Sequence, residues 1–173
     1  PELLDQLFTQ TATRQYTHKL LFSTLVDVTA LVVCRIHRSH HAAYQADPAQ
    51  VGASLRALYD KLDHTEPAVA GALVHHIGER LIPVVQQLQA GLTPRLPGYR
   101  LRILDGNHLA ATQHRLKELR PLRSGPLPGQ ALVVDDPQGM VITDVVPCED
   151  GHAQERALLG EVLPLVQANE VWV

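Results

Sequence analysis

The sequence predicts a protein of mixed α and β structure, with a helical first half and a β-sheet in the second half. Residues 1–90 place apolar side chains at helical spacing, whereas residues 99–146 contain short apolar runs typical of strands. Residues 91–98 hold two prolines and two glycines between these halves. We therefore expect a helical region over 1–90, a linker over 91–98 and a sheet domain over 99–173.

Composition is that of an ordinary globular protein. The 173 residues are 45% hydrophobic and 19% charged, with a net charge of −3, so the chain as a whole is not a polycation. The longest apolar run, residues 30–34, is far too short to span a membrane, and we expect no membrane association. Cys34 and Cys148 match no zinc spacing and are interpreted as buried, reduced thiols of a cytosolic protein.

Four helices are expected in the first half. Their predicted ranges are 2–10, 18–38, 48–62 and 66–90. Pro48 and Pro67 suit first-turn positions, Asp47 suits an N-cap, and Pro83 is expected to kink the last helix. The last two helices favour a plain hairpin over a DNA-reading helix-turn-helix, because the second has few exposed bases.

Histidines gather at two places in these helices. His37, His40 and His41 are interpreted with their neighbouring arginine as the cationic end of the second helix, because no Cys, Asp or Glu lies within a few residues to complete a metal site. His75 and His76 are adjacent, point about 100° apart on a helix and are interpreted as surface residues.

Three strands, a helix and a fourth strand are expected after the linker. The strands are predicted over 99–104, 131–134, 140–146 and 171–173, with a type I turn over 136–139 and a helix from about residue 150. The predicted buried stripe of that helix is Ala157, Leu158, Leu159, Val162, Leu163, Leu165 and Val166. The helical crossover makes the last strand parallel to its partner. Placing that strand beside the first gives the first half of a ribonuclease-H-like sheet.

The first strand delivers one carboxylate, Asp105, within an apolar run. Burying a lone charge is costly without a partner, and a divalent metal ion is one common partner. The alternative is a strand that ends in a surface Asp105–Gly106 turn, because Asp-Gly is a frequent turn signal.

Several blocks of this sequence resemble transposases of the DDE type, in the insertion-sequence-four group. The most specific blocks are ILDGNHLAAT at 103–112 and CEDGHAQER at 148–156, with LYDKL at 58–62, HRLK at 114–117 and LPGQALVV at 127–134. Weaker likeness extends into the N-terminal helices, so the resemblance spans nearly the whole chain.

The resemblance implies DNA transposition by metal-dependent strand cleavage and transfer, with magnesium or manganese as cofactor. Asp105 then corresponds to the first catalytic acid and a metal ligand. The family's second aspartate follows the strand at 171–173, and its glutamate lies further on, so we expect a truncated piece that is inactive alone and binds no metal tightly. It also implies transposon-end DNA as partner, a homodimer when complete, and a cytoplasmic, nucleoid-associated bacterial protein.

Residues 95–123 contain seven basic residues against two acids, in a chain that is acidic overall. We expect Arg115, Lys117, Arg120 and Arg123 to contact DNA phosphates, with a solvated basic face as the alternative.

Smaller polar groups complete the candidate set. Asn107, His108 and His152 are candidates to support the metal site, and helix capping is the alternative for the cluster at 149–155. Asp135 and Asp136 are interpreted as turn formers, and Asp144 is a minor candidate.

A non-catalytic DNA-binding or protein-interaction protein is the alternative function for the whole chain. It would use the helices of residues 1–90 and the basic stretch.

Overall fold

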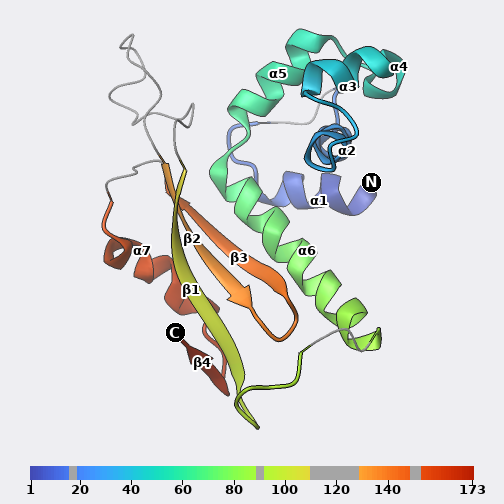
Figure 1. Cartoon of the computed structure of the whole chain (residues 1–173). Helices are drawn as coiled ribbons and strands as arrows, with labels where there is room; N and C mark the ends of the chain where they lie inside the picture. Colours follow the sequence, from blue (N-terminus) through green and yellow to red (C-terminus); the bar gives the residue numbers. More distant parts are fainter. Residues whose placement is uncertain (16–18, 89–91, 110–128, 149–152) are drawn as a thin grey trace. The chain divides into compact units, whose positions relative to one another are not determined.

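The computed structural model describes the chain except residues 16–18, 89–91, 110–128 and 149–152 (Figure 1). The chain divides into two compact units, residues 1–69 and 70–173. We describe each unit by itself. The helix that begins at Pro67 falls almost entirely in the second unit, so it groups with the sheet rather than with the helices before it.

The described part of the first unit is helical. Its elements are α1 (Glu2–Thr11), α2 (Phe22–Val33), α3 (His40–Ala46), α4 (Pro48–Val51) and α5 (Leu55–His64). The single helix predicted over 48–62 is wrong, because Gly52 adopts the left-handed conformation (φ 63°) and separates α4 from α5. Asp47 caps α4 as predicted, with its side chain accepting from the Gln50 N–H.

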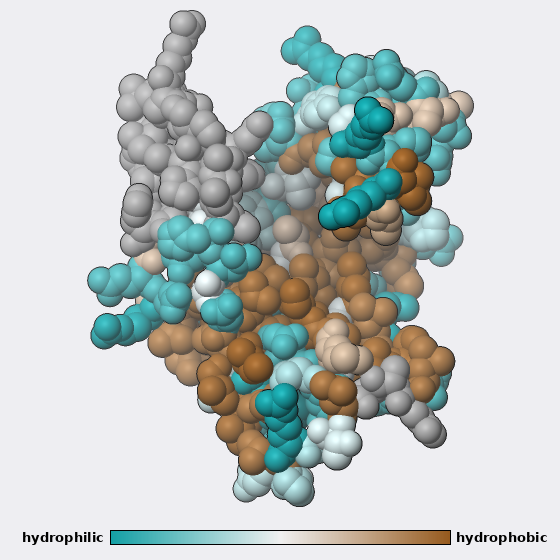
Figure 2. Space-filling view, viewed as in Figure 1, coloured by the Kyte–Doolittle hydropathy of each residue, from teal (hydrophilic) through white to brown (hydrophobic). Residues whose placement is uncertain are grey.

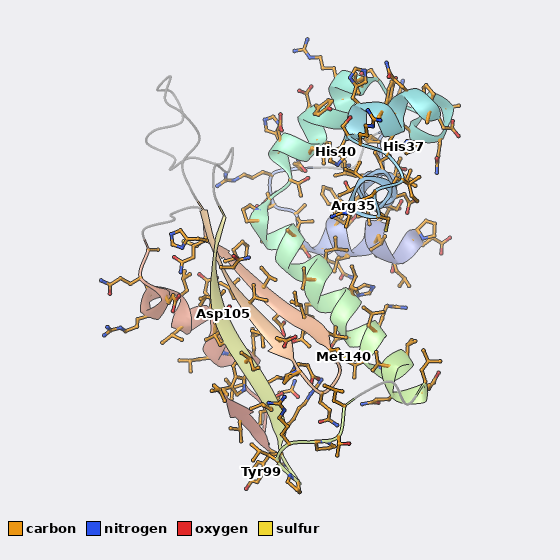
Figure 3. All side chains as sticks on the ribbon, in the orientation of Figure 1. Arg35, His37, His40, Tyr99, Asp105 and Met140 are labelled. Carbon is orange, nitrogen blue, oxygen red and sulfur yellow. The ribbon has the colours of Figure 1, made fainter. Side chains whose placement is uncertain are left out.

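The interpretation of the histidine cluster as a helix end is also wrong. Helix α2 ends at Val33, and α3 begins at His40 with Ser39 as its N-cap. Cys34, directly after α2, is exposed, so its predicted burial is wrong. The Ser39 hydroxyl accepts a hydrogen bond from the Ala42 N–H, which satisfies one donor of the first turn. His37 and His40 therefore lie in the connection and the first turn that follows it, as Figure 3 shows.

The first unit closes around a small aromatic core. Phe8 of α1 stacks on Phe22 of α2 with ring centroids 5.0 Å apart, and Leu58 of α5 is fully buried. The Asp5 carboxylate accepts hydrogen bonds from the backbone N–H and the hydroxyl of Ser23, at 2.9 and 2.8 Å. An acid of α1 therefore caps the positive end of α2 and fixes the packing of these helices.

The second unit is built on a four-stranded mixed sheet. Its strands are β1 (Arg100–Leu109), β2 (Gly129–Asp136), β3 (Val141–Cys148) and β4 (Glu170–Trp172), in the order β3-β2-β1-β4. Strand β2 is antiparallel to both β1 and β3, whereas β4 is parallel to β1 (Figure 1). The predicted mixture of α and β structure is confirmed, and so is the position of the last strand beside the first.

Strand β1 is longer than predicted. It continues without interruption through Asp105 and Gly106 to Leu109, so the interpretation of Asp-Gly as a surface turn is wrong. The turn after β2 is also one residue longer than the predicted 136–139, because Met140 follows in the left-handed region (φ 52°; Figure 3) before β3 begins. Asp136 does form this turn, accepting hydrogen bonds from the N–H groups of Gln138 and Gly139.

Helix α7 (Glu155–Val162) covers one face of the sheet and continues into a 3-10 turn at Leu163–Leu165. It begins at Glu155, later than predicted, with Gln154 at the N-cap position. Its Leu158 and Val162 pack on Leu132 and Val146 of the sheet. Most of the wider predicted stripe is wrong, because four of its seven residues are exposed: Ala157, Leu159, Leu163 and Val166.

Helix α6 (Pro67–Gln87) lies along edge strand β3 (Figure 1). Two glycines, seven residues apart, permit the approach: a Cβ on Gly71 would lie 2.9 Å from the Val145 carbonyl oxygen, and one on Gly78 would lie 3.0 Å from Ile142 O and Thr143 Cα. Midway between them, His75 Nδ1 and an Asp144 carboxylate oxygen are 2.6 Å apart. The helix thus covers a strand edge that would otherwise be open to pairing.

Helix α6 also has the length and apolar composition of a membrane-crossing helix, although little of it is buried inside the second unit. Its exposed apolar side chains are Ile77, Leu81, Val84 and, just beyond its end, Leu88. It runs through Pro83 without ending there. Figure 2 shows the resulting hydrophobic surface over the sheet and α6.

We expect Gly78→Ala to destabilise the second unit by about 1–3 kcal/mol, because the added methyl group meets backbone that cannot move aside cheaply. Helix propensity alone would favour alanine by roughly 1 kcal/mol. Gly160→Ala in α7 is the matched control, because nothing lies within 4 Å of that position. Urea unfolding measures both variants, and a Gly78→Ala protein as stable as Gly160→Ala would contradict the proposed packing.

Candidate functional site

Asp105 lies near the middle of β1, opposite Val133 of β2 (Figure 3). Side chains alternate along the strand, so Asp105 shares a sheet face with Ile103 and Asn107. All three side chains are exposed. The expectation of a buried, uncompensated acid is therefore wrong: the carboxylate faces outward, and folding imposes no burial cost on it.

The opposite face of β1 belongs to the core under α7. Leu104 packs against the cluster of Leu132, Val146, Leu158 and Val162. Gly106 lies directly beneath the Glu155 carboxylate, at a distance that leaves no room for a Cβ. His108 falls on this same face by alternation, away from Asp105. Of the two predicted neighbours, only Asn107 shares the face of the acid.

Strand β4 ends beside Asp105. The Leu104 N–H donates to Val173 O at 2.9 Å, and the Val173 N–H donates to Arg102 O at 3.0 Å. This parallel register runs from Arg100–Glu170 through Arg102–Trp172. A side chain at the end of β4 therefore lies one strand away from Asp105.

A buried ionic network holds β4 in this position. Arg102 is 7% exposed, and its guanidinium donates to Glu170 Oε1 and to the Thr143 hydroxyl, each at 2.9 Å. The second Glu170 oxygen accepts from the Trp172 indole N–H at 3.0 Å. One arginine thus joins β1, β3 and β4, and every partner of the charge is itself hydrogen-bonded.

Asp136 extends the network to the turn after β2. Arg100 donates to Asp136 Oδ2 at 2.6 Å, and the Arg102 guanidinium lies 4.0 Å from the same oxygen. Burial alone would raise the pKa of Asp136, but the hydrogen bond from Arg100, the Gly139 N–H and the two arginine charges outweigh it. The pKa of Asp136 is therefore lowered.

Glu170 follows the same pattern. Burial would raise its pKa, whereas the hydrogen bonds from the Gln167 N–H, Arg102 and Trp172, together with the Arg102 charge, lower it. No local pattern identified this residue, because a glutamate at the start of a three-residue strand looks like any solvated acid.

The arrangement around Asp105 offers oxygen ligands. A carboxylate at 105 and an amide oxygen at 107, two residues apart on one exposed face, suit a hard cation such as Mg²⁺ or Mn²⁺. Within the residues that the structure describes, no group of three or more His, Cys, Asp or Glu is gathered as a metal site. The donor types fit the implied cofactor, although two of them do not complete its coordination.

The predicted DNA-contacting residues Arg115, Lys117, Arg120 and Arg123 lie outside the described residues, and so does His152. Three other members of the same basic stretch are placed: Arg95 is exposed, whereas Arg100 and Arg102 make the ion pairs above. Because Arg102 is buried and Arg100 is paired with Asp136, the count of seven basic residues overstates the charge that is free to meet DNA phosphates.

Among the remaining acidic candidates, Asp135 lies within β2 and pairs with Ile103 and Ile142, so its interpretation as a turn former is wrong. Asp136 forms the turn and pairs with Arg100, and Asp144 contacts His75 of α6. His75 is exposed as predicted despite this contact, and His76 accepts a hydrogen bond from Arg80 Nε.

Neither a family model, nor a curated protein, nor a solved structure matches this chain.

We expect Arg102→Met to lower the free energy of unfolding by about 3 kcal/mol or more, because it leaves Glu170 buried without its cation and removes one of the two arginine charges near Asp136. Arg156→Met is the matched control, since Arg156 is exposed on α7. The measurement is urea unfolding followed by the fluorescence of Trp172, the single tryptophan. Equal midpoints for the two variants would show that the network contributes little.

Stability of the second unit should fall with acidification. Both carboxylates have pKa values below their ordinary 3.8 (Asp136) and 4.5 (Glu170), so the folded state binds protons less readily than the unfolded state. Their contribution is complete above about pH 5 and is lost as the pH falls through the lowered values. Trp172 fluorescence against urea, between neutral pH and pH 3, measures this loss. Glu170→Gln should be less stable at neutral pH and should lose less stability on acidification.

Proposed function

We propose that this chain carries part of the metal-binding site of a DNA transposase of the DDE type, with Asp105 as a metal ligand. The proposed reaction is metal-dependent cleavage and transfer of DNA strands. The observation that carries the proposal is the position of Asp105: an outward-facing carboxylate on a central strand, with a parallel strand ending beside it.

The geometry supports the proposal in two ways. No ion pair or hydrogen bond to the Asp105 carboxylate occurs among the described residues, whereas Asp136, Asp144 and Glu170 are all engaged. The buried Arg102 network also holds β4 rigidly against β1, which is the kind of support that a metal-ligand pair on neighbouring strands requires.

A bound Mg²⁺ or Mn²⁺ would supply Lewis-acid activation of the phosphodiester and of the attacking oxygen. The chain's own contribution would be to hold the ion through Asp105, with the Asn107 amide oxygen beside it. Since magnesium is held poorly by one carboxylate, we propose that tight binding needs further acids beyond these two residues.

A non-catalytic interaction protein is a second candidate. The exposed apolar residues on the outer side of α6 and on the Asp105 face favour it, because contiguous apolar surface often marks a protein contact. The two candidates differ in their dependence on Asp105, which an interaction protein has no chemical reason to require.

In the protein expressed from the complete reading frame, Asp105→Asn should lower Mg²⁺-dependent strand cleavage roughly a hundred-fold or more, because loss of metal activation costs several kcal/mol. DNA affinity in a gel-shift assay should change little. Asp63→Asn, an exposed acid at the end of α5, is the matched control. Unaltered cleavage by Asp105→Asn would exclude the proposed role of this carboxylate.

The same residue can be tested in the present chain. Paramagnetic Mn²⁺ should broaden the backbone NMR signals of residues 103–107 selectively, and Asp105→Asn should remove that broadening. Broadening spread evenly over the surface acids would mean that Asp105 has no particular affinity for the ion.

A further inference from the structure

A cavity of about 620 Å³ lies in the first unit, along one face of α5. Its α5 wall consists of Ser54, Ala57, Lys61 and His64, which recur at helical spacing. The described residues between α1 and α2 that line the other side are Arg14, Gln15, Lys19 and Leu20. Its volume lies in the range of sites that bind a small organic ligand.

The segment that carries Arg14 is held in place by a carboxylate. Glu66 accepts hydrogen bonds from the Thr13 N–H and hydroxyl and from the Arg14 N–H, at 2.9, 2.6 and 2.7 Å. The Thr13 hydroxyl bond is the main reason that the pKa of Glu66 is lowered. The cavity wall is therefore preorganised by contacts that leave the Arg14 guanidinium uncommitted.

The cavity is positively charged. Arg14, Lys19 and Lys61 line it with His64, against one acid, Asp60. The Asp60 carboxylate lies 3.7 Å from the exposed Arg56, which offsets part of its charge. Arg14 and Lys19 have no ion pair among the described residues, so their charges are available to an anion.

Lys61 has a structural role in the same wall. Its ammonium donates to Leu20 O at 2.6 Å and lies 4.7 Å from the centre of the Phe8 ring. Burial lowers its pKa, and the charge of Asp5 acts in the opposite direction. Lys61 thus fixes Leu20 against α5 and adds positive charge to the cavity.

Two polar groups of the wall are suited to a ligand with hydrogen-bonding edges. The Gln15 side-chain oxygen is buried and has no hydrogen-bond donor within the described part of the chain. The Asp60 backbone carbonyl can only accept a hydrogen bond, so His64 Nδ1, 2.6 Å away, must carry the proton. The other ring nitrogen of His64, Nε2, then remains to hydrogen-bond a ligand. A buried acceptor without a donor is costly, and a ligand amino group would satisfy it.

We propose that this cavity, the α5 cavity, binds a nucleotide unit: an adenine-like base with a phosphate. The phosphate would contact Arg14 and Lys19, the amino group of the base would donate to Gln15, and Leu20 with Ala57 would provide the apolar surface. The chemistry is the same whether the unit is a free nucleotide or is presented by a DNA strand. The proposal does not depend on Asp105 or on strand cleavage.

Isothermal titration calorimetry with deoxyadenosine monophosphate tests the proposal. Arg14→Ala and Lys19→Ala should each weaken binding about ten-fold, the cost of one lost charge-assisted contact. Ala57→Leu should weaken binding strongly, because the larger side chain projects into the cavity while keeping a good helix former in α5. Arg38→Ala is the matched control: it removes one exposed charge of the same unit from outside the cavity.

Deoxyadenosine and inorganic phosphate, titrated separately, should bind far more weakly than the nucleotide that joins them. A labelled single-stranded oligonucleotide then distinguishes a free nucleotide from a DNA strand as the ligand. If deoxyadenosine monophosphate displaces the oligonucleotide, a strand enters the α5 cavity. If the nucleotide binds and the oligonucleotide does not, the ligand is a free nucleotide. Both results support the proposal.

Failure of nucleotide and oligonucleotide to bind at millimolar concentration would overturn the proposal. So would binding that Ala57→Leu and the Arg14→Ala/Lys19→Ala double variant leave unchanged. Circular dichroism confirms that each variant is folded. If Ala57→Leu unfolds, the double variant carries the test, because both of its side chains are exposed.

Discussion

The second unit depends on one buried cation, the Arg102 guanidinium. It sits among three strands and contacts Glu170, Thr143 and, at the edge of ion-pair distance, Asp136. A three-residue strand such as β4 has too few backbone hydrogen bonds to fix its own position. The charge pair supplies that specificity, because only one register of β4 brings Glu170 to Arg102.

The rest of the second unit follows from this arrangement. The Trp172 indole, held by Glu170, joins the apolar cluster under α7, so that β1, β4 and the helix share one core. Asp105 lies on the other face of β1, where side chains are exposed. The strand is thus rigid on its core side and open on the side that carries the carboxylate, which is the combination that a metal or a partner would need.

The two units use their cations differently. In the second unit Arg100 and Arg102 are paired with buried acids, and Arg102 is itself buried. In the first unit Arg14 and Lys19 line an open cavity without ion-pair partners among the described residues. The affinity of this protein for anions cannot therefore be estimated from the net charge, because burial decides which charges reach the solvent.

The sequence by itself determined most of the succession of elements, because apolar period, proline and N-cap chemistry act over a few residues, but it did not predict α3 or the break between α4 and α5. The helical crossover also indicated a last strand parallel to its partner, and the expected pairing of β4 with β1 is observed. Where a boundary depended on distant contacts, local reasoning failed: β1 continues through Asp105–Gly106 because β2 pairs with it residue by residue.

The tertiary structure alone decided which polar side chains are engaged. Asp105 was identified from the sequence, but its exposure and its separation from His108 followed from the pairing of β1. Glu170 and Arg14 carried no local signal, and their roles arise from partners 68 and 52 residues away. Helices and strands begin from contacts between residues that are close in sequence, so most of these elements were predictable. The engagement of charges and the lining of cavities depend on contacts between residues that are far apart in sequence, so the sites were not.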